Sequence, residues 1–384
     1  MRIDAPWLTD APLTAIFAAF EAAGHHAYLV GGAVRNAVLG EAIGDLDLAT
    51  DATPDQMTEL ARAAGIKAIP TGVDHGTMTL VAHGVPFEIT SFRRDVETHG
   101  RRATVAFTGE MEGDARRRDF TMNALYAASD GKVIDPLGGL PDALARRVRF
   151  IEDAHRRIEE DYLRILRFFR FHAQYGGDGG IDADGLAAVA DNLDGLDGLA
   201  RERVGSEMRR MLAAPDPGPA VAAMAQVGAL ARVLPGADHR ALAPLVHLEG
   251  EVAAPPDAIR RLAALGGEDV RDRLRLSNAH AARLDLLRRE VGSMTDAGVL
   301  GYLHGADAAH DILLLRAALL EQPLDKAALE AATEGAEAVL PIAAADLMPE
   351  FQGAALGGRL KMLEERWIAS GFALTKGDLL KEGK

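Results

Sequence analysis

The hydrophobic pattern changes character near Pro141, and no other feature constrains the fold as strongly. Before this point, short apolar runs bounded by glycine alternate with stretches of helical composition, a pattern typical of an α+β unit. After it, alanine and leucine dominate between glycine and proline breaks, which indicates a succession of short packed helices. A chain of 384 residues is too long for one ordinary core, so we expect two or three packed units.

Local signals within the first 140 residues predict the order of the elements. Thr53-Pro54 combines an N-cap with a proline suited to the first helical position, and Asp45 to Thr50 alternates Asp and Leu with the period of a half-exposed strand. The expected helices are Pro12–Ala23, Ala33–Leu39 and Pro54–Ala64. The expected strands are Ala27–Val30, Asp45–Thr50, Gly76–Ala82 and Val85–Phe92, with a final hairpin of Ala124–Ala127 and Lys132–Ile134.

Composition narrows the possible chemistry. The chain has no cysteine, which excludes disulfides, thiolate zinc sites, iron–sulfur clusters and cysteine nucleophiles, so oxygen or imidazole would have to hold any metal. A net charge of −15, taken over the whole chain, argues against nucleic acid as a partner. Residues 91–170 nevertheless carry 16 Arg or Lys against 14 Asp or Glu, so an arginine-rich track and a set of solvated helix faces both remain open.

The sequence carries no pattern of a membrane-spanning or exported chain. No uncharged apolar run reaches the ~18 residues needed to cross a bilayer. The first residues include Asp4 and Asp10, where a signal peptide needs an unbroken apolar segment. We therefore expect a cytoplasmic protein with no membrane partner.

Two neighbouring carboxylates form the first candidate site. On a strand, Asp45 and Asp47 would project from one face, where they could hold cations against a polyphosphate in two-metal phosphoryl transfer. An ordinary solvated strand edge is the alternative. Glu88, on the expected strand Val85–Phe92, is a candidate third carboxylate or, equally, a surface residue.

A diglycine segment lies just upstream, in Gly31-Gly32-Ala33-Val34-Arg35, between an expected strand and an expected helix. Glycine lets the backbone approach an anion, the helix N-terminus presents free N–H groups, and Arg35 adds a guanidinium fork. These features favour a triphosphate-binding turn, with an ordinary tight turn as the alternative.

Two later clusters are rich in arginine. Arg116 to Asn123 places three arginines beside an acid, which fits either a basic surface or a nucleotide contact. Glu160 to Phe171 reads as one helix, on which Asp161, Arg164, Arg167 and Arg170 would form a polar stripe. An exposed helix with intrahelical ion pairs is the alternative for the second cluster.

Taken together and in this order, these segments resemble the class II tRNA nucleotidyltransferase and poly(A) polymerase family over about residues 25–210. The matching motifs are Gly31-Gly32-x-Val34-Arg35, Asp45-x-Asp47, Arg117-Arg118-Asp119-Phe120-Thr121-x-Asn123, Asp135–Gly139, Glu160-Asp161-x-x-Arg164, and Arg201-Glu202-Arg203-Val204 with Glu207. The resemblance implies an α+β protein with a polymerase-β-like nucleotidyltransferase head and a mixed sheet, followed by an all-α neck, body and tail. We expect the catalytic head at 1–140, the neck at 141–212, and a body and tail that bind tRNA at 213–384.

The resemblance also implies an activity and the residues that carry it. The activity is template-independent addition of C, C and A to the 3′ end of tRNA from CTP and ATP, with release of pyrophosphate. Asp45 and Asp47 would bind Mg²⁺, and Glu88 is the candidate third catalytic carboxylate. The nucleotide-binding residues are Gly31, Gly32, Arg35, Arg118, Asp119, Asp161, Arg164, Arg167 and Arg170. Asn36 departs from the family, which usually has aspartate there, so any supporting role of that position is open.

A carboxylate beside a guanidinium could select the base without a template. Cytosine and adenine both offer an amino group next to a ring-nitrogen acceptor, so Asp161 could accept from the amine while Arg164 donates to the ring nitrogen. Uracil and guanine would leave unpaired polar groups that cost about 1–3 kcal/mol each. The tRNA itself would be held through backbone phosphates and recognised by shape.

Several alternatives share parts of this pattern. A bacterial poly(A) polymerase would use ATP alone, although residues 51–77 resemble the CCA enzymes. A CC-adding or A-adding enzyme is a second possibility; CC-adding members have a shortened form of the segment between Arg93 and Arg116, which the resemblance marks as mobile and as the place of the change from C to A. A non-catalytic RNA-binding module would be favoured if Asp45 or Asp47 were missing. His310-Asp311 raises the possibility of an added phosphohydrolase, with a packed helix as the alternative.

Overall fold

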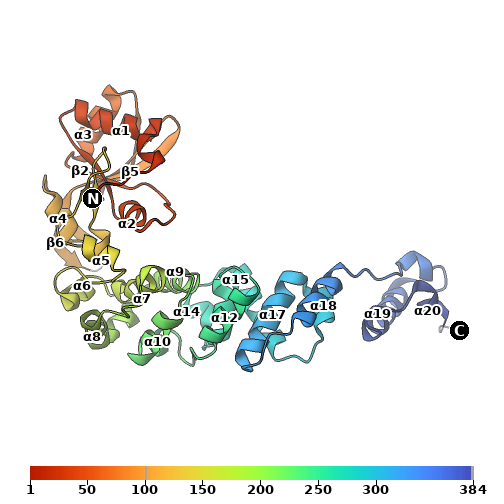
Figure 1. The fold of residues 1–384 in the computed structure, drawn as a ribbon. Helices are drawn as coiled ribbons and strands as arrows, with labels where there is room; N and C mark the ends of the chain where they lie inside the picture. The colour runs from red at the N-terminus through yellow and green to blue at the C-terminus, as the bar shows by residue number, and fades with distance from the viewer. Residues whose placement is uncertain (100–101, 382–384) are drawn as a thin grey trace. The chain divides into compact units, whose positions relative to one another are not determined.

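The computed structural model describes residues 1–99 and 102–381, which form two compact units. The first unit is Met1–Pro235 and the second is Gly236–Lys384. Figure 1 shows that strands are confined to the N-terminal part and that helices make up the rest. The expected boundaries at 140/141 and 212/213 both fall inside the first unit, and the division into head, neck and body stays a prediction.

A seven-stranded mixed sheet forms the centre of the N-terminal part, as the resemblance implied. The strand order is β3-β4-β5-β2-β1-β8-β9; β2 runs parallel to β5, and the other pairs are antiparallel. The strands are β1 (Ala27–Val30), β2 (Leu48–Thr50), β3 (Lys67–Gly72), β4 (Thr77–Ala82), β5 (Val85–Ser91), β8 (Tyr126–Ala127) and β9 (Val133–Ile134). The helices before and between them are η1 (Pro6–Thr9), α1 (Ala11–Ala22), α2 (Gly32–Leu39), α3 (Pro54–Ala63) and η2 (Val73–His75).

Most of the elements expected in this part are confirmed. The cap on α3 is a full capping box, in which Thr53 and Gln56 satisfy each other's backbone N–H groups. The turn at His83 and Gly84 joins β4 to β5 with positive φ at both residues, as a two-residue hairpin requires. The sequence reading missed β3, which carries Pro70 and lies at the sheet edge, where a proline is tolerated.

The prediction of one strand from Asp45 to Thr50 was wrong in its first half. The strand begins at Leu48, and Asp45 and Asp47 lie in the irregular segment before it. The reason is the length of the neighbouring strand: β1 ends at Val30, whose N–H donates to the Asp47 carbonyl at 3.0 Å, and Gly31 then turns the chain away with φ 66°. Residues before Asp47 therefore have no partner on the β1 side of the sheet.

The segment from Arg93 to Arg116 forms the hairpin β6 (Arg93–His99) and β7 (Arg102–Phe107), followed by α4 (Met111–Arg116). Residues 100 and 101 of the expected mobile segment lie outside the described residues. The chain then continues into the first unit's helical part. Its helices are η3 (Thr121–Asn123), α5 (Leu140–Leu144), α6 (Ala154–Glu160), α7 (Leu163–Tyr175), α8 (Ala183–Asp191), η4 (Leu193–Gly198), α9 (Arg201–Leu212), α10 (Gly218–Gln226) and α11 (Ala229–Val233).

An aromatic cluster joins the sheet part to these helices. Phe120 is fully buried, and its ring centroid lies 5.0 Å from those of both Phe150 and Phe171 and 6.3 Å from that of Phe168. Phe168 and Phe171 belong to α7, so the Arg117–Asn123 motif is packed directly against this helix. Such aromatic packing fixes the helix relative to the motif.

The prediction of one continuous helix from Glu160 to Phe171 was also wrong. The chain is extended at Asp161, with φ −155° and ψ 102°, so α6 ends at Glu160 and α7 begins at Leu163. The Asp161 carboxylate accepts the N–H of Leu163 at 3.1 Å, a local bond that competes with continuing the helix. Arg164, Arg167 and Arg170 lie on α7, whereas Asp161 lies in the break before it.

The second unit is entirely helical in its described residues. Gly335 and Gly301 allow α16 and α18 to touch, since a Cβ on either would lie 1.9 Å from a backbone oxygen of the other helix. The elements are α12 (Leu242–Glu251), α13 (Ala258–Leu265), α14 (Val270–Arg273), α15 (Asn278–Val291), α16 (Ala297–His304), α17 (Ala306–Leu319), α18 (Lys326–Glu337), η5 (Ala344–Leu347), α19 (Gly353–Ala369) and α20 (Lys376–Lys381). Within residues 1–99 and 102–381, no helix combines the length and apolarity that a membrane span requires.

His310 and Asp311 have packing roles in this unit. Asp311 is buried and pairs with Arg260 at 2.7 Å and with Arg283 at 2.5 Å. The His310 ring hydrogen-bonds the Leu329 carbonyl and the Thr333 hydroxyl at 3.0 and 3.1 Å. These contacts agree with the packed-helix alternative.

Candidate active site

The diglycine turn after β1 needs glycine for two reasons. Gly31 has φ 66° and ψ −118°, a conformation that side chains with a Cβ avoid. A Cβ at this position would also lie 3.3 Å from Nη1 of Arg118. The turn therefore brings an arginine from a motif some 90 residues later (Gly31 against Arg118) directly over the backbone that leads into α2.

Three carboxylates line a cleft of about 520 Å³, which Gly31, Gly32, Arg35 and Arg118 do not line. Asp45, Asp47 and Glu88 line it together with residues of β4 and β5. Leu48 pairs in parallel with Ile89, and Asp47 and Glu88, the residues just before them, both line the cleft and interact electrostatically. The sequence prediction that Glu88 joins the aspartate pair thus agrees with the geometry, even though the two aspartates precede the strand.

Asp47 lies among other carboxylates in this cleft. Burial raises the pKa of Asp47, the charges of Glu88 and Asp45 raise it further, and the guanidinium of Arg118 acts in the opposite direction. Like charges held together without a compensating cation are what a divalent ion would relieve.

Within the described part of the chain, no set of three or more His, Asp or Glu side chains is arranged to hold a metal ion unaided. Asp45 and Asp47 fit the role nevertheless, because Mg²⁺ is usually bound by one or two carboxylates that substrate phosphates and waters supplement. Hard oxygen donors are also the ligands that this ion prefers.

Arg118 is oriented by a residue that the sequence reading missed. Nε and Nη2 of Arg118 donate to the buried Asp114 at 3.3 and 3.0 Å, and the Tyr126 hydroxyl donates to the same carboxylate oxygen at 2.7 Å. Burial alone would raise the pKa of Asp114, but the guanidiniums of Arg118 and Arg117 outweigh it, and the pKa lies below its ordinary value. The available signal was the spacing: Asp114 stands four residues before Arg118, one helical turn away.

The Asp119 carboxylate bonds only groups of the protein in this structure. It is buried and accepts from the Asn123 amide at 2.9 Å, from the Phe120 N–H at 2.9 Å, and from Arg167 at 2.7 and 2.5 Å. Burial would raise its pKa, but Arg167 and these hydrogen bonds lower it overall. In the structure Asp119 anchors α7 to the motif, and its predicted contact with the nucleotide stays a prediction.

Arg35, a residue of α2, is buried, and its side chain contacts α7. Its guanidinium donates to the Asn36 side chain at 3.1 and 2.9 Å, to the Asn123 side chain at 2.5 Å, and to the Tyr175 hydroxyl at 2.7 Å. Burial lowers its pKa from the ordinary arginine value. Asn36, where the resembled family usually has aspartate, thus does have a supporting role: it holds Arg35 while donating to the Ala42 carbonyl at 2.7 Å.

The residues predicted to read the base form ion pairs with other side chains of the protein. Asp161 pairs with Arg203 at 2.6 Å. Arg164 pairs with Glu160 at 2.6 Å and also donates to the backbone carbonyls of Arg157 and Arg117 at 2.7 and 3.1 Å.

Further along α7, Arg170 pairs with the buried Glu207 at 2.5 Å and donates to Gln174 at 2.8 Å. Arg203 and Glu207 belong to the last matching motif, for which the sequence predicted no contact. The packing of α9 against α7 brings them to Asp161 and Arg170.

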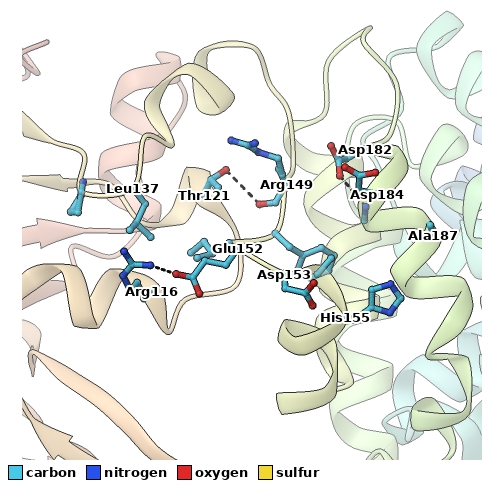
Figure 2. Close-up of a pocket in the computed structure, with 15 residues that line it drawn as sticks. Arg116, Thr121, Leu137, Arg149, Glu152, Asp153, His155, Asp182, Asp184 and Ala187 are labelled. Carbon is cyan, nitrogen blue, oxygen red and sulfur yellow. Dashed lines mark hydrogen bonds and ion pairs between the residues drawn. The ribbon is translucent and has the colours of Figure 1, made fainter.

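A second cleft, of about 790 Å³, lies elsewhere in the first unit (Figure 2). Figure 2 shows Arg116 paired with Glu152 on one side and Asp182 and Asp184 on the other, with Arg149 and Asp153 between them. The residues predicted from sequence to bind nucleotide or metal do not line it. It is therefore separate from the candidate active site.

Comparisons with known proteins find similar nucleotidyltransferases. The model of the poly(A) polymerase head domain matches residues 27–149, and a model described as the probable RNA- and SrmB-binding site of polymerase A matches residues 180–240. The human mitochondrial CCA tRNA nucleotidyltransferase 1 is 44% identical over 190 residues, which are 49% of this chain and 44% of that protein. The CCA-adding enzyme of Geobacillus thermodenitrificans is 40% identical over 215 residues, 56% of this chain and 52% of that protein. The chain thus spans about half the length of the curated relatives it matches.

Among solved structures, the Bacillus stearothermophilus CCA-adding enzyme in complex with CTP superposes with a TM-score of 0.74 at 26% identity, covering 94% of both chains. The Thermotoga maritima CCA-adding enzyme complexed with tRNA superposes with a TM-score of 0.72 at 17% identity, over 99% of this chain and 95% of that one, and shows the same fold. Enzymes with this polymerase-β-like head generally use divalent metal ions. The order of the motifs and these similarities lead to one conclusion: residues 27–149 match the poly(A) polymerase head domain, and the chain is similar to CCA-adding enzymes and tRNA nucleotidyltransferases in sequence and fold.

Proposed function

We propose that this protein adds C, C and A to the 3′ end of tRNA, using CTP and ATP and releasing pyrophosphate. The observation that carries the proposal is the meeting of Asp45, Asp47 and Glu88 in one cleft, within electrostatic reach of Arg118 above the diglycine turn. Carboxylates that hold cations, and an arginine beside a helix N-terminus that binds a polyphosphate, are the two halves of a nucleotidyltransferase site.

The reaction joins the 3′ hydroxyl oxygen of the tRNA to the α-phosphorus of the nucleotide while the bond to pyrophosphate breaks. Asp45 and Asp47 would hold Mg²⁺, which when bound supplies charge for activating the hydroxyl and for stabilising the leaving pyrophosphate. Arg118 and Arg35 would bind the polyphosphate, with Gly31 and Gly32 giving it access to the backbone. Held in line, the reacting groups gain most of their rate from positioning and electrostatics.

Base choice is assigned to the neck. Asp161 and Arg164 flank the break between α6 and α7, and each is oriented by a partner, Arg203 for the acid and Glu160 for the arginine. Such support fits side chains that must present one acceptor and one donor to the base in a fixed order. Arg167 and Arg170, on the next two turns of α7, would complete the nucleotide pocket, and the segment from Arg93 to Arg116 is the proposed place of the change from C to A.

Relatives support the choice of tRNA and of both nucleotides. The curated relatives reported above are named for CCA addition, and the solved relatives include complexes with CTP, with ATP and with tRNA. A cytoplasmic setting belongs to the same proposal, and a chain without cysteine suits a reducing compartment.

The test is an incorporation assay with the full chain and Mg²⁺. Three tRNAs, one lacking the CCA end, one ending in C and one ending in CC, are each incubated with CTP, with ATP and with both. The proposal predicts two C additions from CTP alone, one A addition to the tRNA ending in CC, and no growth beyond CCA. Long A tracts would indicate a poly(A) polymerase, addition of only C or only A would indicate a partial enzyme, and tRNA binding without addition would indicate a non-catalytic module.

A further inference from the structure

Tyr175, the last residue of α7, grips Arg35 in two ways. Its hydroxyl accepts a hydrogen bond from Nη2 of Arg35 at 2.7 Å, and the guanidinium carbon lies 3.9 Å from the centre of its ring. Phe171, one turn earlier, adds a second ring at 5.2 Å. An arginine of the diglycine helix α2 is thereby held by a side chain of the neck, 140 residues later in the sequence.

All the groups that hydrogen-bond this guanidinium in the structure are uncharged side chains. Asn36 and Asn123 accept from it through amide oxygens, and Tyr175 accepts through a phenol. A carboxylate in any of these places would neutralise the guanidinium as well as orient it. Neutral acceptors fix its direction without forming an ion pair with it, although the charges of Asp119 and Glu41 also act on it.

We propose that Tyr175 is a positioning residue, which holds the Arg35 guanidinium from the neck side so that it can bind the polyphosphate of the incoming nucleotide at the diglycine turn. The inference rests on the proposed function and adds a residue to it. Tyr175 shares α7 with Arg164, Arg167 and Arg170, so the contact joins the helix assigned to the base with the turn assigned to the phosphates. The docking of α7 against α2 would then set the strength of phosphate binding.

Two variants separate the two contacts that Tyr175 makes. Tyr175→Phe removes the hydrogen bond and keeps the ring, whereas Tyr175→Leu removes both. Tyr302→Phe is the matched control: it deletes a hydroxyl that donates to Glu364 at 2.5 Å in the second unit. Far-ultraviolet circular dichroism and melting temperature verify that each variant is folded.

The measurement is the dissociation constant of each full-length variant for CTP and for CMP, by equilibrium dialysis, with and without Mg²⁺. Loss of one oriented hydrogen bond should weaken CTP binding about three- to tenfold in Tyr175→Phe, and more in Tyr175→Leu. CMP lacks the β- and γ-phosphates, so its affinity should change little, and Tyr302→Phe should leave both constants unchanged. In steady state, the Tyr175 variants should show a raised KM for CTP and ATP with a smaller change in kcat.

Other outcomes would overturn the inference. Equal weakening of CTP and CMP in Tyr175→Phe would mean that the residue only supports the fold, and unchanged CTP binding in both Tyr175 variants would mean that Arg35 needs no support from the neck. A wild-type protein that binds neither nucleotide would overturn the proposed function, and the inference with it.

Discussion

Two aspartates in the first unit have opposite environments. Asp47 lies in the carboxylate cleft, and Asp119 lies where the Arg117–Asn123 motif packs against α7, a contact that we call the joint. Asp47 stands among other carboxylates, and burial together with Glu88 and Asp45 raises its pKa. Asp119 is buried among donors, and Arg167 with its hydrogen bonds lowers its pKa. The neighbours of Asp47 thus oppose its charge, whereas the neighbours of Asp119 compensate its charge.

Buried ion pairs at the joint contribute to the stability of the fold. Arg167 bonds Asp119, Arg170 bonds Glu207, and both acids are buried. Breaking a buried pair by removing one partner typically costs about 3–5 kcal/mol, because an unpaired charge remains. Variants here should therefore lose stability, whereas variants in the cleft should lose activity.

The largest expected effect is on catalysis in the cleft. Asp47→Ala or Asp45→Ala should slow nucleotide addition by at least about a thousandfold, some 4 kcal/mol of barrier, because the cations lose a ligand. Rates of CTP incorporation measure the loss. Binding of tRNA should be retained, and Asp55→Ala, an exposed acid at the start of α3, should keep normal rates. Normal turnover in Asp47→Ala would remove the metal assignment.

The next effect is on stability at the joint. Asp119→Asn should lower the free energy of unfolding by about 3 kcal/mol, because Arg167 loses its charged partner in a buried site. Asp130→Asn is the control: Asp130 pairs with Arg2 at 2.6 Å on the surface, and its loss should cost under about 1 kcal/mol. Urea unfolding measures both. Equal, small losses of unfolding free energy in the two variants would show that the buried ion pair of Asp119 stabilises the fold no more than the surface pair of Asp130.

The pH dependence of the joint has a definite sign. The folded pKa of Asp119 lies below the ordinary value of 3.8, so its ionised form contributes stability above pH 3.8 that is lost as the pH falls through the folded value. The stability gap between wild type and Asp119→Asn should therefore be constant near neutrality and shrink below pH 3.8. A gap that widens on acidification would contradict the assigned pairing.

A smaller effect is expected on base selection. Arg164→Ala should relax discrimination against UTP and GTP by about tenfold, because the wrong bases no longer face a misplaced donor. Competition between CTP and UTP for one tRNA measures it. Arg156→Ala, which removes an exposed arginine of α6 that also pairs with Glu160, is the matched control. Slower addition with unchanged selectivity would mean that another group reads the base.

The smallest effect has the opposite sign to that at the joint. Asp47→Asn should slightly raise the melting temperature of the metal-free protein at pH 7, because it removes one of three crowded charges. The folded pKa of Asp47 is raised, so its penalty is fully present above that value and absent below the ordinary value of 3.8. The difference should accordingly vanish in acid. A lower melting temperature at pH 7 would show that Asp47 is not repelled by its neighbours.

Short-range pattern predicted much of the fold correctly. β1, α2, α3 and the β4–β5 hairpin follow from apolar runs, caps and turn glycines that lie within a few residues of one another. Two predictions failed: the strand does not extend back to Asp45, because its partner β1 ends at Val30, and α6 ends at Glu160, where the extended Asp161 accepts the N–H of Leu163. β3 was missed because its proline is acceptable only at a sheet edge, and position in a sheet is not a local property.

The sequence by itself determined the chemical inventory of the site and its order along the chain: the diglycine turn, the two aspartates, the arginine motif and the neck acids. Residue types and spacing suffice for this, because they depend on neighbours a few positions away. Only the tertiary structure decided the partners, placing Arg118 over Gly31, Asp47 beside Glu88, and Tyr175 on Arg35. These contacts join segments tens to more than a hundred residues apart, so they depend on how the chain folds and not on neighbouring positions in the sequence.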